Sequence, residues 1–236
     1  MKPKTFTSSS GVSVGEVWEI ARGVNLTSDG RTIDFYTKSG NIGDYTAVIA
    51  LIPDYDLIIA INMAGPDSSL TAIQILLSAV ATVLVPAVDD VAKATAAKQY
   101  SGTYVASSNS SITLAVDDGG LFVSDFTANG ADVLVGYAAM SGADMGNTSI
   151  RLYPTGLSSG NRSAWRAVYN PNSAEELAEV DAQLFFPQGS CQSWSAIDLT
   201  TYGLQALDYF VFTEHANGTV ATVEPRAWRL VLNNAE

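Results

Sequence analysis

The clearest chemical signal in the sequence is the run Tyr36-Thr-Lys-Ser-Gly40. Lys38 can place a fixed positive charge in a cleft, and the Ser39 hydroxyl can form hydrogen bonds or relay a proton. Gly40 has no side chain, so a substrate backbone can come close to the chain there. Because Tyr36, Lys38 and Ser39 could polarise a carbonyl or bind a carboxylate, we assign them as candidate catalytic residues. The same run also fits a surface strand that ends in a Ser-Gly turn.

Other residues that could act as nucleophiles or bases have weaker support. Gly156-Leu-Ser-Ser-Gly160 matches the G-x-S-x-G pattern, but a nucleophile elbow needs a following helix, and a β-type segment follows here. We therefore expect a polar hairpin loop. His215 fits a solvated loop, and Cys191 fits a buried thiol. Three acidic side chains fit one solvated face of a short helix rather than an acid/base pair: Glu175, Glu176 and Glu179.

Aromatic residues gather in the second part of the chain, where strand alternation would point about half of them inward. They would either fill a core or line a cavity for an apolar ligand. Trp165, Arg166 and Trp228 are assigned as candidate substrate-binding residues. Arg166, Arg226 and Arg229 could contact an acidic ligand or lie on the surface. With one cysteine and one histidine in the chain, we expect no metal site, and no cofactor is indicated.

The first third of the sequence predicts an antiparallel meander covered by a helix. The helix is expected over residues 68–85, ending at Pro86, with a linker helix over 86–99. Residues 68–88 carry no charge and are long enough to span a bilayer, so a transmembrane helix is the alternative to a helix buried on the sheet. The expected strands are 17–24, 31–37, 46–52 and 57–61.

After Tyr100 the pattern changes to short β-type segments at roughly ten-residue spacing, typical of a β-barrel or sandwich. The turn Asp117-Asp-Gly-Gly120 predicts a hairpin, and residues 170–179 a turn followed by a short helix. The expected strands are 102–106, 112–116, 121–126, 133–137, 150–153, 164–169, 183–186, 207–212 and 228–232.

The composition excludes several classes of protein. Hydrophobic residues make up 47% and charged residues 15%, which excludes disorder. The net charge is −12 and no basic run occurs, so we expect no nucleic-acid partner, and we expect no membrane partner. No signal peptide precedes the first strands, which predicts a cytoplasmic location, or a secreted one if an upstream segment is missing. The secretion alternative has weak support from glycosylation triplets at Asn25, Asn109, Asn147, Asn161 and Asn217.

Several segments carry a resemblance to a known family. About residues 1–85 resemble the C-terminal part of the serine-β-lactamase-like transpeptidase/esterase domain of fungal β-lactamase-related proteins, in which Lys38-Ser39-Gly40 would be the third signature. The resemblance implies that Gly40 and Asn41 bind substrate, with the Asn41 N–H as half of an oxyanion hole. Residues 100–236 look like the lipocalin-like barrel that follows this domain. The segments that carry the resemblance are Val14–Ile20, Asp34–Tyr45, Ala50–Leu57, Asn62–Gly65, Tyr100–Tyr104, Cys191–Trp194 and Leu207–Phe212.

The sequence departs from this family in its catalytic motifs. No lysine has a serine three residues before it, no Tyr-x-Asn occurs, and Ser-x-Asn appears only at or after Ser39. The resemblance therefore implies a truncated α+β region over residues 1–85 without its nucleophile, followed by a mainly-β lipocalin-like barrel over 86–236. We expect the uncovered sheet face to be buried against the chain's own barrel or a second copy of the chain.

Three functions remain open. The first is a repurposed protein that binds an apolar small molecule and catalyses a non-hydrolytic cyclisation or isomerisation, as the resemblance implies for fungal secondary metabolism. The second is part of a serine hydrolase or acyltransferase that needs a missing N-terminal part. The third is a ligand-binding module without catalysis. Turnover of nitrocefin or of a p-nitrophenyl ester by the chain alone would contradict the expected absence of the nucleophile.

Overall fold

The structure is a computed structural model that describes residues 2–144, 146–185 and 196–235. The chain divides into two compact units, Met1–Ala92 and Lys93–Glu236. Both are built mainly from antiparallel sheets, with three α-helices in the described residues. The expected mixture of helices and antiparallel sheets is thus confirmed. The expected domain boundary at residue 85 falls inside the first helix.

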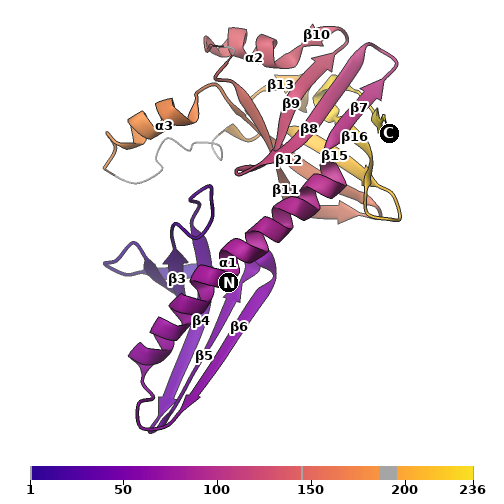
Figure 1. The fold of residues 1–236 in the computed structure, drawn as a ribbon. Helices are drawn as coiled ribbons and strands as arrows, with labels where there is room; N and C mark the ends of the chain where they lie inside the picture. The colour runs from indigo at the N-terminus through magenta and orange to yellow at the C-terminus, as the bar shows by residue number, and fades with distance from the viewer. Residues whose placement is uncertain (1, 145, 186–195, 236) are drawn as a thin grey trace. The chain divides into compact units, whose positions relative to one another are not determined.

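The first unit holds a six-stranded antiparallel sheet in the order β1-β2-β3-β4-β5-β6 (Figure 1). The meander predicted from the sequence is confirmed as β3 to β6, while β1 and β2 were not predicted. A short 3-10 helix, η1 (Pro53–Tyr55), joins β5 to β6. The strands are β1 (Pro3–Phe6), β2 (Val12–Gly15), β3 (Glu19–Gly23), β4 (Ile33–Ile42), β5 (Tyr45–Ile52) and β6 (Leu57–Ala64).

Helix α1 (Leu70–Tyr100) covers one face of this sheet (Figure 1). Alternate side chains of β4, β5 and β6 meet α1 and form the core of the unit, because successive residues of a strand point to opposite faces. The core includes Ile33, Phe35, Ala50, Ile52, Ile59, Ala81 and Val85.

The sequence prediction for this helix was wrong in one respect, since Pro86 lies inside α1 rather than ending it. A proline within a helix removes one backbone hydrogen bond. The Ala-rich residues on its C-terminal side favour helix strongly enough to continue it. By length and composition α1 could cross a membrane, with a mean hydropathy of 2.1 in its most apolar stretch. Only 17% of that stretch is buried, so the helix packs on the sheet by one side and is otherwise exposed.

A buried polar network fastens α1 to the sheet. The Asp89 carboxylate, which is 3% exposed, accepts hydrogen bonds from the Arg31 guanidinium at 2.9 Å and from the Tyr55 hydroxyl at 2.8 Å. Arg31 also donates to Asp29. Burial and the hydrogen bond to Asp89 raise the pKa of Tyr55, so its hydroxyl stays protonated and acts as a donor.

The second unit is a closed ring of antiparallel strands. The strands follow the order β9-β11-β12-β15-β16-β17-β7-β8, and β8 pairs back with β9. Its strands are β7 (Gly102–Ala106), β8 (Ser110–Asp117), β9 (Gly120–Ala128), β10 (Ala131–Asp132), β11 (Ser149–Ser159), β12 (Arg162–Asn170), β15 (Tyr209–Glu214), β16 (Val220–Pro225) and β17 (Leu232–Asn234). A separate pair is formed by β13 (Thr201–Tyr202) and β14 (Gln205–Ala206).

Aromatic and aliphatic side chains fill the inside of the ring. Phe126 and Phe210 lie edge to face at 6.5 Å, and Trp165 and Phe212 at 5.0 Å. Tyr100 at the end of α1 packs against Trp165 at 4.9 Å. Of the two outcomes expected for the aromatics, a packed core is thus the one seen for these residues.

Three predicted strands of this unit were wrong or incomplete. Residues 133–137 belong to helix α2 (Val133–Ser141), which Asp132 caps by accepting a hydrogen bond from the Val135 N–H. Residues 226–228 form the 3-10 helix η3 (Arg226–Trp228), and the last strand starts only at Leu232. Residues 183–185 are not strand, and residue 186 lies outside the described residues.

The predicted turns and the short helix are confirmed. The hairpin turn lies between Asp117 and Gly120. Helix α3 (Ala174–Asp181) begins with a capping box in which Ser173 and Glu176 satisfy each other's backbone N–H groups.

Candidate functional site

The run that opened the sequence analysis lies on a strand with one free edge. β4 pairs with β3 from Ile33 to Thr37 and with β5 from Tyr36 to Ile42. Beyond Thr37, no other strand among the described residues pairs with β4 on the β3 side. Backbone groups on that side are therefore open to an extended substrate, although the Ser39 carbonyl already accepts a 3.3 Å hydrogen bond from the Lys38 ammonium.

Lys38 and Ser39 share one acidic partner at this edge. The Lys38 ammonium donates a 2.6 Å hydrogen bond to the Glu19 carboxylate, and the Ser39 hydroxyl lies 3.5 Å from the other oxygen of Glu19. The side chains of Lys38 and Glu19 are 52% and 48% exposed. The pair is thus accessible and is weakened by solvent, so an incoming anion could compete with Glu19 for the ammonium.

Strand alternation splits the candidate residues between the two faces of the sheet. Ser39 and Asn41 face the side covered by α1, where Asn41 Nδ2 donates to the Thr46 hydroxyl at 2.7 Å. Tyr36 and Lys38 face the other side. A Cβ at Gly40 would meet no atom within 4 Å, so the chain is open to close approach at that residue.

Tyr36 lines a polar pocket of about 400 Å³ on this face, with Arg22, Asp34 and Asp54. Burial raises the pKa of Asp54. The Arg22 guanidinium lies 3.3 Å from Asp34. Lys38 and Ser39 do not line this pocket, so Tyr36 belongs to a group of residues separate from them.

The candidate substrate-binding residues of the second unit do not form one site. Trp165 is buried in the core and donates through its indole N–H to Ser163. Arg166 leaves the opposite face of the same strand and pairs with Asp198 at 2.7 Å and Asp208 at 2.9 Å. Trp228 lies in η3 and stacks with Tyr202 at 5.9 Å.

Trp228 does line an apolar pocket of about 250 Å³ beside α2. Tyr137 and Tyr169 form another part of its wall, with ring centres 5.0 Å apart. Burial raises the pKa of both tyrosines, so both hydroxyls stay protonated at neutral pH. The lining of this pocket is mainly apolar, and its volume lies just below the usual range of ligand pockets.

The remaining candidates from the sequence are placed as expected. The G-x-S-x-G run ends β11 and turns directly into β12, so no nucleophile elbow is formed. His215 is exposed in a turn, and Glu176 serves the capping box of α3. Cys191 lies outside the described residues.

The sequence analysis missed one partner at the free edge. Glu19 lies within the segment Val14–Ile20, to which the sequence analysis assigns no chemical role, yet it contacts both Lys38 and Ser39. The strand register Glu19↔Thr37 brings it there, and no short-range sequence pattern carries that information.

The comparisons with known proteins identify a family. The family described as "Beta-lactamase-like-like, C-terminal domain" matches residues 92–236. The chain therefore belongs to the beta-lactamase-like-like C-terminal domain family.

Longer fungal proteins match almost the whole chain. A "Beta-lactamase-like protein" of Arthroderma benhamiae is 30% identical over 95% of this chain and 42% of its own length. A "Probable hydrolase M10" of Phoma sp. is 30% identical over 98% of this chain and 40% of its own length. A "Probable hydrolase clz13" of Cochliobolus lunatus is 28% identical over 99% of this chain and 39% of its own length.

The chain thus spans about two fifths of the length of these relatives. No solved structure gives a significant match.

Proposed function

We propose that the first unit forms one wall of a hydrolase-type acyl-transfer site, and that a segment outside the present sequence supplies the nucleophile. The observation that carries the proposal is the free edge of β4, where no strand among the described residues pairs with Lys38, Ser39, Gly40 and Asn41 on the β3 side. Two relatives are named as probable hydrolases, which supports the same class of reaction.

Each residue of the wall has a separate role in this proposal. An extended substrate adds to the edge of β4 through backbone hydrogen bonds, and Gly40 leaves room for it. Lys38 provides positive charge beside the acyl group, while the Asn41 N–H stabilises the developing oxyanion. Glu19 holds the Lys38 ammonium at the edge until an anionic group of the substrate displaces it.

The test is a chimera in which residues 1–236 of this chain replace the matching region of the Arthroderma benhamiae relative. We expect the chimera to hydrolyse p-nitrophenyl butyrate, and Lys38→Ala to lower kcat/KM about 100-fold or more. Lys4→Ala is the matched control, because Lys4 forms an exposed pair with Glu16 at 3.9 Å on the same sheet. Equal activity of the Lys38→Ala chimera, or full activity of the chain alone, would contradict the proposal.

A second candidate is a binding protein for an apolar small molecule that also cyclises or isomerises it without hydrolysis, in fungal secondary metabolism. The pocket lined by Tyr137, Tyr169 and Trp228 favours it. Incubation of the chain with polyketide- or terpenoid-type compounds, with Trp228→Ala beside the wild type, tests this candidate. Binding without turnover would favour a non-catalytic ligand-binding module.

We also propose that the second unit is lipocalin-like. The closed up-and-down order of its strands supports this interpretation.

A further inference from the structure

A groove on the outer face of the second unit contains an unusual charge arrangement. The register places Ala164 of β12, Val211 of β15 and Glu224 of β16 in one row across three strands. Their neighbours Trp165 and Phe212 point into the core, so this row lies on the outer face. Val211 and Glu224 are nevertheless only 6% and 8% exposed. Something on the outer face must therefore cover them.

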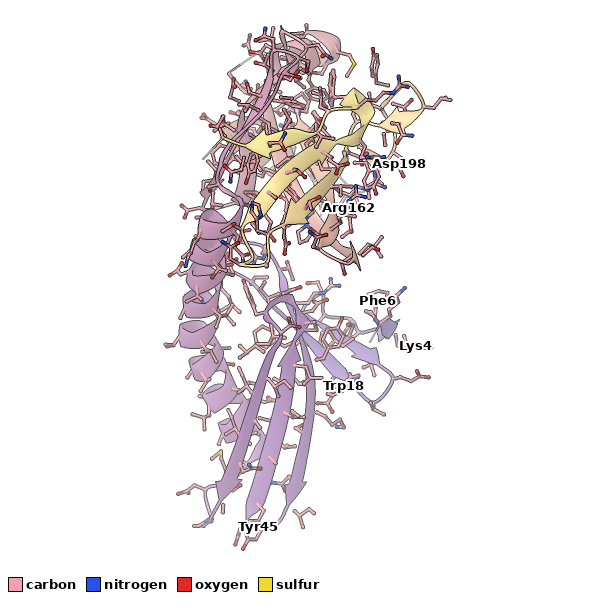
Figure 2. All side chains as sticks on the ribbon, turned by 90° about the vertical axis from the view of Figure 1, so that its right-hand side faces the viewer. Lys4, Phe6, Trp18, Tyr45, Arg162 and Asp198 are labelled. Atoms are coloured by element: carbon pink, nitrogen blue, oxygen red, sulfur yellow. The ribbon has the colours of Figure 1, made fainter. Side chains whose placement is uncertain are left out.

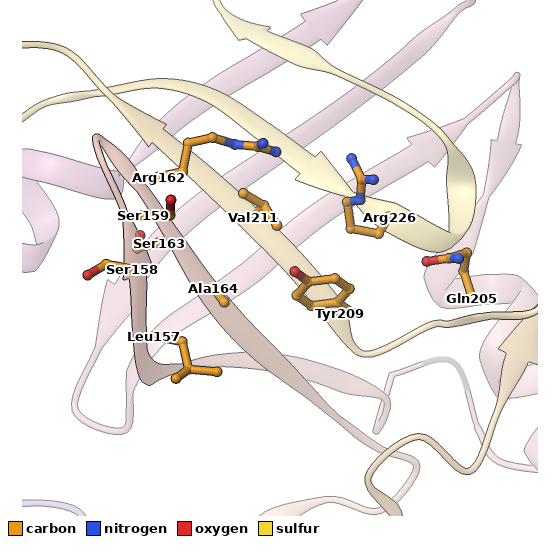
Figure 3. A pocket seen from close by; sticks show the side chains of 10 residues that line it. All are labelled: Leu157, Ser158, Ser159, Arg162, Ser163, Ala164, Gln205, Tyr209, Val211 and Arg226. Atoms are coloured by element: carbon orange, nitrogen blue, oxygen red, sulfur yellow. The ribbon is translucent and has the colours of Figure 1, made fainter.

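Two arginines provide that cover. Arg162 Nη2 donates to both oxygens of Glu224 at 3.1 Å, and Arg226 Nη1 donates to one of them at 2.7 Å. Figure 3 shows the two guanidinium groups on either side of Val211. Two positive charges therefore share one carboxylate, which leaves a local charge of +1 in a chain whose net charge is −12.

The arginines retain capacity for a second anion. Each guanidinium has five N–H donors, and the hydrogen bonds recorded for Arg162 and Arg226 each use one nitrogen. Their side chains are 49% and 45% exposed. The remaining donors can thus be reached from solvent, and two guanidinium groups together match the oxygens of a carboxylate or phosphate.

The rest of the groove has the size and the mixed polar and apolar lining that a small molecule requires. Its volume is about 370 Å³, within the range of ligand pockets. Val211, Ala164 and Leu157 offer apolar surface, while the Ser158 and Ser159 side chains line the wall on β11 (Figure 3). An oxyanion on the arginines would leave the apolar part of its molecule against Val211 and Leu157.

The neighbouring arginine on the same face lacks this excess positive charge. Arg166 lies on the same outer face of β12 but contacts two carboxylates, Asp198 and Asp208. Its cluster is therefore net negative and offers nothing to an anion. We propose that the groove between Arg162 and Arg226 binds a small organic oxyanion, a carboxylate or phosphate carried on an apolar body.

The test uses the full chain labelled with ¹⁵N and three probes of one shape: 2-naphthoate, 2-naphthyl phosphate and the neutral 2-naphthalenemethanol. We expect saturable amide shifts in residues 157–164, 209–211 and 224–226 with at least one anion. The neutral alcohol should bind at least about tenfold more weakly, and added salt should weaken the anion. The tighter of the two anions identifies the group that the site prefers.

Two variants should change affinity in opposite directions. Arg162→Gln should weaken binding of the anion about tenfold, because one of the two positive charges is lost. Glu224→Gln should tighten it several-fold, since the internal carboxylate no longer competes for the arginines. Arg226→Gln provides a second loss-of-charge variant if Arg162→Gln fails to fold. Arg151→Gln is the matched control, because Arg151 pairs with Asp117 at 2.7 Å outside the groove.

The alternative is that the Arg–Glu–Arg cluster only covers the outer face of the sheet. Any one of four results would overturn the proposal. Two concern affinity: all variants bind the anion equally, or the alcohol binds as tightly as the anions. The other two are amide shifts confined to the Trp228 pocket, and no binding of either anion at millimolar concentration.

Discussion

Each of the two units buries one face of an antiparallel sheet, but they do so in different ways. In the second unit β8 pairs back with β9, so eight strands close into a ring that encloses its own core. In the first unit the sheet stays open, and α1 covers only one face. The candidate Lys38–Gly40 wall lies on the open sheet, at an edge that a closed ring would have removed.

The open sheet also leaves apolar side chains on its other face, which we call the open face. Tyr45, Ile49 and Ile58 on this face are 68%, 37% and 63% exposed, and Tyr45 lies at the tip of the β4–β5 hairpin (Figure 2). Contiguous apolar patches of this kind usually mark a surface that another part covers. The comparison therefore predicts that the closed ring covers its own core, while the open face of the first sheet needs a partner to cover it.

The largest expected effect tests the packing of the closed ring. Phe210 is fully buried against Phe126, so Phe210→Ala should lower the free energy of unfolding by about 3–5 kcal/mol. Ile58→Ala on the open face should cost less than about 0.5 kcal/mol. Urea unfolding followed by near-UV circular dichroism measures both. A similar cost for the two variants would show that Ile58 is covered in solution and would break the contrast between the sheets.

The next effect concerns the network that fastens α1 to the open sheet. Arg31→Met removes a charged donor from the buried Asp89 carboxylate and should cost about 2 kcal/mol. Adding Asp89→Asn should recover part of this loss, because no uncompensated charge is then buried. Hydrogen exchange of the β4 and β5 amides measures the change. The control is Arg22→Met, which breaks a more exposed pair with Asp34 and should cost under about 1 kcal/mol. If Arg22→Met costs as much as Arg31→Met, Asp89 has no special role.

Much of this architecture follows from local patterns in the sequence. Alternating residues predicted β4 to β6, and the apolar run after Ser68 predicted the helix on the sheet. Turn residues placed the Asp117–Gly120 hairpin. These features depend on residues near each other in the chain, where strand period and turn chemistry act directly.

Other features depend on contacts between distant residues and were missed. Glu19 reaches Lys38 only through the pairing of β3 with β4, and Arg162 meets Glu224 across 62 positions of the sequence. Local chemistry disfavours proline inside a helix and so predicts a helix end at Pro86, yet the helix continues through it. The short β-rich run at 133–137 became helical because Asp132 caps it and Gly142 ends it.

A third prediction asks whether the open face binds a second copy of the chain. We expect the wild type to form a dimer in light scattering at micromolar to millimolar concentration. Placing charge on the open face with Ile58→Glu should weaken the dimer at least about tenfold, a change of about 1.4 kcal/mol. Val105→Glu, at a valine of the closed ring that is 42% exposed, is the control and should leave association unchanged. A wild type that stays monomeric throughout would remove the second copy as the partner of this face.

The smallest effect is a pH dependence that distinguishes a salt bridge of the closed ring from packing. Hydrogen bonds from the Arg151 guanidinium hold the pKa of Asp117 below its usual range, and partial burial opposes them. Since the folded pKa is the lower one, the pair stabilises the fold above about pH 4 and loses this effect as the pH falls through the folded pKa. The contribution should stay below about 1 kcal/mol, because the Asp117 side chain is 42% exposed.

Asp117→Asn should therefore be less stable than the wild type at pH 6 and nearly equal to it near pH 2.5, as measured by urea unfolding. The neighbouring Asp118→Asn should track the wild type at both pH values, and a pH-independent loss in Asp117→Asn would show that its role in the hairpin turn outweighs the ion pair.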